Sequence, residues 1–402
     1  MDVLSLSLVL ATVFGWCVLA SRLQRAGLTA PIVFVTAGFV LSEGLEVLDL
    51  ALEPHLVKVI AEVTLVWVLF ADASRVRPSQ FRRDLGLYGR LLGVGLPLTV
   101  ALGTAAALVV LDVDLWAALL IGAALAPTDA ALGATVMSDP AVPGKVRRAL
   151  NVESGLNDGI ATPIVLVAIA GVATSEGIAG VESPSRAVLS LVVGVLAGAA
   201  VGGLGGVATR LARRRGWLSE ELSGPAVLAL ALLAYTGALL VDGNGFVAAF
   251  VGGLVFGGVA GRGGEKEVYF VEQSGDIASM ASWLIFGALA VPLIGDAWTP
   301  NVLGYAVLSL TVIRMLPVAL ALAGAGFDRF AVAFVGWFGP RGLASVIFAL
   351  LAVEDLHDTG KDLAAVIALT VLLSVVAHGF SGGPLAKRFT DSPDRSTAPT
   401  EP

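Results

Sequence analysis

Residues 151–163 read Asn-Val-Glu-Ser-Gly-Leu-Asn-Asp-Gly-Ile-Ala-Thr-Pro and run directly into the uncharged segment 164–172. The first part carries two carboxylates, two amides and two hydroxyls, and the second is entirely apolar. Polar groups at the head of so apolar a helix are costly, and ionisable residues at membrane depth mark functional sites. We therefore expect the rest of the chain to hold this helix in a bilayer.

The composition agrees with a membrane location. The 402-residue chain is 56% hydrophobic and only 14% charged, with a mean hydropathy of +0.88, whereas soluble domains contain about 25% charged residues. The chain is therefore predicted to be a polytopic membrane protein. Its one cysteine, Cys17, excludes an internal disulfide and a cysteine-based metal cluster within one chain.

The apolar segments predict about 13 transmembrane helices, because a membrane-spanning helix needs ~20 mostly apolar residues. The predicted spans are 3–20, 28–42, 56–72, 88–111, 115–135, 146–173, 185–207, 224–241, 244–260, 275–294, 301–324, 328–352 and 361–384. Residues 1–385 are thus predicted to form a single transmembrane domain. Residues 386–402, which are polar, are expected to be a short disordered cytoplasmic tail.

Basic residues alternate between the loops that join these spans. Of 25 lysines and arginines, 20 fall in odd-numbered loops or the C-terminal tail, and only Lys58, Arg186 and Lys361 fall on the even side. Cytoplasmic loops carry the excess of basic residues. This pattern predicts a multi-pass protein of the cell (inner) membrane, with its N-terminus outside and its C-terminus in the cytoplasm.

Two spans contain a proline within a polar motif. Span 5 contains Ala-Pro-Thr-Asp at residues 126–129, and span 12 contains Gly-Pro-Arg-Gly at 339–342. These positions correspond if spans 1–6 and 8–13 form two inverted repeats around span 7, and paired breaks of this kind indicate discontinuous helices crossing near the bilayer midplane. The predicted fold is an all-α membrane protein with discontinuous helices 5 and 12. A simple proline kink is the alternative.

The polar residues near these breaks suit a monovalent cation. Ser154 and Asp158 are four residues apart and are expected to share a helix face. The break in span 5 adds Thr128 and Asp129. Carboxylate, hydroxyl and carbonyl oxygens are the ligands of hard cations, so these four residues form a candidate Na⁺ site. Burial disfavours the charged form of a carboxylate, and a proton would therefore compete with the cation for Asp158.

Three other charged residues at membrane depth have expected partners. Glu153 is expected to pair with Arg314, because an intramembrane carboxylate seeks a base. Arg341, beside the break in span 12, is expected to face the carbonyls and C-terminal dipoles of half-helices.

Two further motifs have more than one interpretation. Gly379-Phe-Ser381-Gly382 follows His378 and spells the Gly-x-Ser-Gly of an intramembrane serine protease, which is a short and unspecific match. Glycines recur every fourth residue from Gly194 to Gly206. Such a face allows close helix packing, either within the protomer or at a dimer interface.

With these motifs assembled, the chain resembles the electroneutral NhaP/NHE-type sodium/proton antiporters of the cation–proton antiporter superfamily over residues 3–385. The most specific parts of the resemblance are Pro-Thr-Asp at 127–129, the Glu-Ser-Gly-Leu-Asn-Asp-Gly segment 153–159, Arg314, and the motif at 339–342. They occur in the family's order and on the spans derived above.

The resemblance implies a role for each site residue. The ion binds the aspartate of the Asn-Asp pair, here Asp158, and the site is completed by Ser154, Thr128 and Asp129. Glu153 corresponds to the glutamate that pairs with the arginine of a later helix, here Arg314. Asn157, where some relatives have a second aspartate, implies that one cation is exchanged for one proton.

The resemblance also implies the larger organisation. Helices 4–6 and 11–13 would form a moving core, and the remaining helices a scaffold that forms a homodimer in the lipid bilayer. The implied function is secondary antiport of Na⁺ or Li⁺ against H⁺ by alternating access, with K⁺/H⁺ antiport as the alternative. Neither cofactor, nucleic acid nor enzymatic activity is expected.

Overall fold

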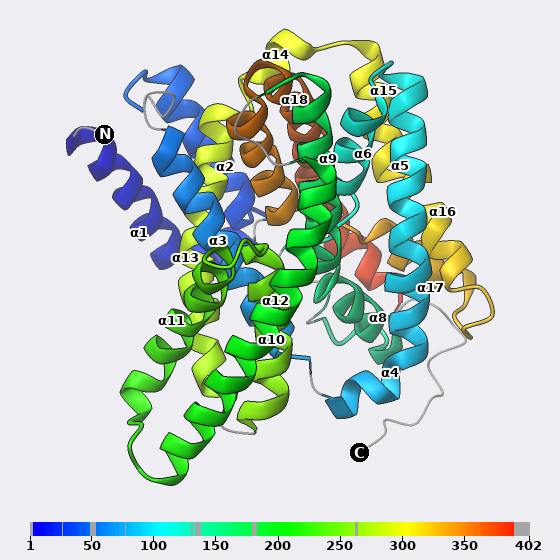
Figure 1. The fold of residues 1–402 in the computed structure, drawn as a ribbon. Coiled ribbons are helices and arrows are strands. Elements are labelled where there is room, and N and C mark those ends of the chain that lie inside the picture. The colour runs from blue at the N-terminus through cyan, green and yellow to red at the C-terminus, as the bar shows by residue number, and fades with distance from the viewer. Residues whose placement is uncertain are drawn as a thin grey trace.

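The computed structural model describes residues 3–25, 27–48, 54–76, 78–129, 132, 137, 139–178, 183–261 and 264–389 (Figure 1). All secondary structure in these ranges is helical. Eight of the helices or joined helices described are long and apolar enough to cross a membrane, and three shorter apolar helices accompany them. The chain is thus an all-helical, multi-pass membrane protein, as its composition predicts.

The helices of the first half correspond to spans 1–7. They are α1 (Val3–Arg25), α2 (Ala30–Phe39) with the π-helical η1 (Val40–Gly44), α3 (Pro54–Ser74), α4 (Pro78–Arg90), the π-helical η2 (Leu91–Gly95), α5 (Leu96–Val110), α6 (Leu115–Ala124), α8 (Gly144–Ser154), α9 (Asn157–Ser175) and α10 (Pro184–Arg214). Span 4 combines α4, η2 and α5, and span 6 combines α8 and α9. The second part of span 5 lies largely outside the described residues.

The helices of the second half correspond to spans 8–13. They are α11 (Glu220–Leu239), α12 (Gly245–Ala260), α13 (Gly264–Leu289), α14 (Leu293–Ala297), α15 (Pro300–Leu310), α16 (Val312–Ala321), α17 (Arg329–Trp337) and α18 (Leu343–Lys387). Span 12 combines α17 with the start of α18. A left-handed residue inside α18, His357 at φ 54°, marks the boundary between spans 12 and 13.

One prediction about span 6 is wrong. We expected a continuous helix over 146–173, but α8 ends at Ser154 and α9 begins at Asn157. Leu156 leaves the helical region at φ −134°, and Gly155 beside it is a weak helix former. Ser154 and Asp158 therefore do not share a face of one regular helix, and any proximity between them depends on the geometry of this break.

The predicted tail also begins too early. Ala386 and Phe389 are buried in a cluster with Phe334 and Phe338, because apolar residues at the end of α18 cover the end of α17. Residues 390–402 lie outside the described residues.

The helices pack in two groups. In the first, α3 lies between α12 and α13, and α10 and α11 pack on α12. In the second, α6 packs against α5 and α9, α15 packs on α18, and α16 packs on α17. α3 and α13 contact α18, and α10 contacts α9, so these helices join the groups. Figure 1 shows the arginine-rich connection after α10 at the lower end of the molecule, with α14 at the upper end.

The glycine face of α10 packs within the protomer. A Cβ atom at Gly198 would lie 2.4 Å from the Ala248 carbonyl oxygen, and one at Gly202 would lie 2.2 Å from the Gly252 carbonyl oxygen. Both carbonyls belong to α12. Of the two interpretations of this face, the structure therefore selects packing of α10 on α12.

Gly202→Ala should destabilise the protein because the added methyl group meets backbone rather than a flexible side chain. Overpacking of this kind costs ~1–3 kcal/mol. Gly203→Ala is the matched control, because a Cβ there makes only an ordinary contact of 3.6 Å with Val255. Thermal unfolding in detergent measures the difference, and equal melting temperatures for the two variants would contradict the close packing of α10 on α12.

Candidate cation-binding site

The broken spans 5 and 12 meet at their interruptions. The backbone amide of Asp129 donates a hydrogen bond to the carbonyl oxygen of Pro340 at 2.9 Å. Residues 126–129 follow α6, and residues 339–342 connect α17 to α18. Two extended segments, each interrupting a span, are therefore in direct contact.

Asp129 caps helical segments from both spans. Its Oδ2 accepts a hydrogen bond from the amide of Leu343, the first residue of α18, at 2.9 Å, and its Oδ1 accepts from the amide of Leu132 at 3.2 Å. Helix N-termini carry a partial positive charge and unpaired amides, which a carboxylate offsets. Gly342 leaves room for this contact, since a Cβ there would lie 1.9 Å from Asp129 Oδ2.

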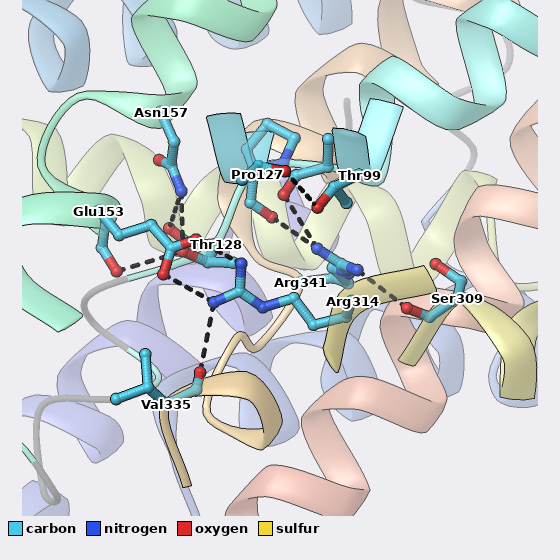
Figure 2. A network of polar contacts seen from close by, with 12 residues as sticks. Thr99, Pro127, Thr128, Glu153, Asn157, Ser309, Arg314, Val335 and Arg341 are labelled. Atoms are coloured by element: carbon cyan, nitrogen blue, oxygen red, sulfur yellow. Dashed lines mark hydrogen bonds and ion pairs between the residues drawn. The ribbon is translucent and has the colours of Figure 1, made fainter. Parts of the chain in front are cut away.

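Arg341 contacts the opposite helix ends. Its side chain is fully buried, and its guanidinium donates to the carbonyl oxygens of Ala126 and Ser309, both at 3.0 Å (Figure 2). These carbonyls lie at the ends of α6 and α15. Ser345 supports the same region by donating to the Ala124 carbonyl oxygen at 2.6 Å. Positive charge is thus placed at helix C-termini, where the helix dipole favours it.

Glu153 and Arg314 form a buried, two-bonded ion pair. Each residue is 2% exposed. Arg314 Nη2 lies 2.7 Å from Glu153 Oε2, and Nη1 bonds Oε1. Arg314 Nη2 also donates to the Val335 carbonyl oxygen at 3.4 Å. The pair, with the two side chains facing each other in Figure 2, connects α8, α16 and α17.

Three side chains from spans 5 and 6 gather beside this pair. The hydroxyl oxygens of Thr128 and Ser154 lie 3.3 Å apart. The Asn157 side-chain amide donates to the Thr128 hydroxyl at 2.7 Å and to the Thr128 carbonyl oxygen at 3.3 Å. Figure 2 shows Asn157 pointing toward Thr128 from the start of α9. The break between α8 and α9 thus brings Ser154 and Asn157 to the same threonine.

Two buried oxygens at this place have no hydrogen-bond partner among the described residues. They are Oδ1 of Asp158 and Oδ1 of Asn157. Buried polar atoms are nearly always paired, so unpaired ones call for an explanation such as a bound ion or water. Together with the hydroxyls of Thr128 and Ser154, which Asn157 reaches through its bond to Thr128, these oxygens are of the type that a hard cation requires.

The sequence matches a known family over nearly its whole length. Residues 8–388 match the transmembrane sodium/hydrogen exchanger family. The chain belongs to this family.

Named relatives and a solved structure agree with the assignment. The chain is similar to the K(+)/H(+) antiporter NhaP of Alkalimonas amylolytica, with 26% identity over 96% of this chain and 67% of the relative. It is also similar to the K(+)/H(+) antiporter NhaP2 of Shewanella sp. (strain MR-4), with 25% identity over 80% of this chain and 56% of the relative. The chain therefore spans only about half to two thirds of the length of these relatives. The sodium proton antiporter MjNhaP1 of Methanocaldococcus jannaschii shares the fold, with a TM-score of 0.78, 19% identity and coverage of 97% and 99% of the two chains.

A polar cavity of about 310 Å³ lies next to the break in span 6 of this exchanger-family fold. It is lined by Asp72, Arg75 and Val76 at the end of α3, by Arg148 and Asn151 of α8, and by Gly155. Gly155 lies between Ser154 and the Asn157–Asp158 pair, so the cavity reaches the segment that carries the candidate ligands. The sequence motifs did not link Asp72 to the site.

Among the described residues, the protease interpretation lacks a hydrogen bond between Ser381 and His378. One ring nitrogen of His378 lies 2.7 Å from the Ser374 carbonyl oxygen, and the other lies 2.7 Å from the Trp337 carbonyl oxygen. Ser381 accepts a hydrogen bond from the Trp337 indole at 2.9 Å. A serine nucleophile needs a base within hydrogen-bond reach. The nitrogens of this histidine instead contact the two backbone carbonyls and the hydroxyl of Ser374, whose oxygen lies 3.1 Å from Nδ1, and Ser381 is not among its partners.

Arg314→Met should strongly destabilise the protein, because it leaves the Glu153 carboxylate buried without its base. Breaking a buried ion pair from one side costs ~3–5 kcal/mol. The double variant Glu153→Gln/Arg314→Met should recover part of this loss. Thermal unfolding in detergent is the measurement, and Lys361→Met, which breaks an exposed pair with Asp358, is the control. An Arg314→Met protein with an unchanged melting temperature would contradict a structural role for the pair.

Proposed function

We propose that this protein is a secondary antiporter that exchanges a monovalent cation for a proton by alternating access. The observation that carries the proposal is the buried, unpartnered Oδ1 of Asp158. Asp158 follows Asn157 in the chain, and Asn157 bonds to Thr128, whose hydroxyl lies 3.3 Å from that of Ser154. Membership of the sodium/hydrogen exchanger family supports it.

Asp158 is the proposed exchange group, with Ser154 and Thr128 supplying further oxygen ligands. A buried carboxylate without a partner is stabilised either by a proton or by a cation. The two ligands therefore compete for the same oxygens, and only one occupies the site at a time. Exchange follows when the site is exposed alternately to the two sides of the membrane. Asp129, predicted as a fourth ligand, has both carboxylate oxygens bonded to backbone amides, and its contact with the ion stays a prediction.

The charges around the site favour one cation for one proton. Glu153 is paired with Arg314, and the Asp129 carboxylate accepts hydrogen bonds from the backbone amides of Leu132 and Leu343. Asn157, which has no charge, donates its amide to Thr128. Asp158 is then the one carboxylate of this group that is free to exchange its partner, and each cycle moves no net charge.

Sodium or lithium is the proposed cation, and potassium is the alternative. Hydroxyl, carbonyl and carboxylate oxygens bind all three ions, and their spacing with an ion bound determines the preference. The similar proteins include two whose names specify K⁺/H⁺ antiport and one described as a sodium proton antiporter. The first test of function should therefore compare the rates of exchange with Na⁺, Li⁺ and K⁺.

We also propose the orientation and assembly that the sequence implies. The second packing group would be the moving core, the first the scaffold and dimer contact, and the arginine-rich end the cytoplasmic side. The distribution of basic residues supports the orientation. The division of helix contacts between the two groups supports the core and scaffold.

Asp158→Asn should abolish cation-driven proton movement, because the amide neither releases a proton nor carries the charge that attracts a cation. The measurement is the internal pH of proteoliposomes after an outward or inward gradient of Na⁺, Li⁺ or K⁺ is imposed. Ser381→Ala is the control and should exchange like the unchanged protein. Retained exchange in Asp158→Asn would contradict the site assignment, and a proteolytic activity that is lost in Ser381→Ala would favour the protease interpretation.

Exchange by the unchanged protein should be independent of membrane voltage, because one positive charge moves each way. Initial rates of Na⁺-driven proton movement are compared at zero potential and at an imposed potential in the same proteoliposomes. Asn157→Asp, which adds a second carboxylate beside Asp158, should make the rate voltage-dependent or lower it by removing the bond to Thr128. A voltage-dependent rate for the unchanged protein would contradict one-for-one exchange.

A further inference from the structure

α3 presents a polar stripe along the boundary between the two packing groups. Residues at spacings of three and four share a helix face, and this face of α3 carries, in order, Lys58, Glu62, Leu65, Leu69 and Asp72. α3 packs mainly on α12 and α13 of its own group, and it also contacts α18 and α9 of the other group. The stripe thus has polar residues at both ends and buried leucines in the middle.

The two ends of this stripe differ. At one end, Asp72 and Val76 line the 310 Å³ cavity that reaches the break between α8 and α9. At the other end, Lys58 Nζ lies 2.7 Å from Asp355 Oδ1 of α18. The rise of an α-helix separates residues 58 and 72 by about 21 Å along α3. The boundary is therefore hollow at one side of the membrane and bridged by an ion pair at the other.

The partners of Lys58 distinguish it from other cations on its side of the membrane. It is one of only three lysines or arginines that the sequence assigns to the even-numbered side. Another of them, Lys361, pairs with Asp358 three residues away in an exposed local contact. The Lys58–Asp355 pair instead joins residues 297 positions apart, from helices of different packing groups, and both side chains are mostly buried.

We propose that the Lys58–Asp355 ion pair holds the ion pathway closed on the side opposite the cavity, and that it must break before Asp158 can face that side. The inference rests on the proposed alternating access, in which α18 moves relative to α3. A partly exposed ion pair contributes only modestly to stability. Such a contact biases the equilibrium between the two conformations without preventing the change.

Lys58 has a second acidic partner within reach when α18 moves away. Glu62 lies four residues further along the same face of α3, the spacing at which side chains of opposite charge interact on a helix. Glu354 is the other acidic residue whose charge acts on Lys58, and it belongs to α18. Exchange of Asp355 for Glu62 would keep the ammonium group paired in both conformations, which lowers the barrier to opening.

Cysteine labelling tests this inference independently of transport. The single cysteine, Cys17, is exposed and is first replaced by serine, after which Val76→Cys places one thiol in the cavity. The labelling rate with a membrane-impermeant maleimide, added from the cavity side, reports how often the cavity is open. Lys58→Met should favour the opposite conformation and lower this rate, by up to about fivefold for a pair of this exposure.

Two further variants make the result decisive. The charge-swapped protein Lys58→Asp/Asp355→Lys should restore the original labelling rate, and Lys361→Met, which breaks the local pair, should leave it unchanged. An unchanged rate in Lys58→Met, or a charge swap that labels as slowly as Lys58→Met, would overturn the proposal. Failure of the unchanged protein to exchange any cation would instead contradict the proposed function, and the labelling result would still stand.

Discussion

The structure depends on the pairing of backbone groups that two interrupted spans leave unpaired inside a membrane. Lipid offers no hydrogen bonds, so irregular backbone at membrane depth must be satisfied by protein or by a water-filled cavity. Here the interruptions satisfy each other: the amide of Asp129 bonds the carbonyl oxygen of Pro340. The Asp129 carboxylate covers the helix N-termini, and Arg341 and Ser345 cover helix C-terminal carbonyls. One acid and one base thus stabilise a crossing that would otherwise be unfavourable in lipid.

This requirement explains why so many charged residues occur near the site while so few are free to bind an ion. Arg341 and Asp129 stabilise the crossing, and Glu153 and Arg314 neutralise each other while tying α8 to α16 and α17. Removing any one of them leaves a buried charge or a helix end without its partner, which is costly at this depth. The polar network is therefore a scaffold for the binding site as much as part of it.

Much of the fold could be predicted from the sequence, because the bilayer requires apolar segments of a certain length and disfavours charged residues and unpaired backbone groups within them. Apolar length and the alternation of basic residues located the spans, and proline located the breaks at Pro127 and Pro340. The ion pair between Glu153 and Arg314 was predictable because a buried carboxylate requires a base. The break at Leu156 was not predictable. A glycine such as Gly155 occurs in many continuous helices, and the contact of Asn157 with Thr128 forms only in the folded chain. Ser345 and Asp72 were missed for the same reason: their partners and cavity come from distant helices.

The break that the sequence did not predict determines how the residues of the candidate site are arranged. In a continuous helix, Ser154, Asn157 and Asp158 would be held at fixed angles around one axis. The turn at residues 155–156 instead allows Ser154 and Asn157 to reach Thr128 from different helices. The side-chain amide of Asn157 donates both of its hydrogen bonds to Thr128. The adjacent Asp158 has a buried oxygen, Oδ1, without a hydrogen-bond partner among the described residues. The neutral amide thus bonds to the threonine without adding a charge, which is the arrangement that the proposed one-for-one exchange requires.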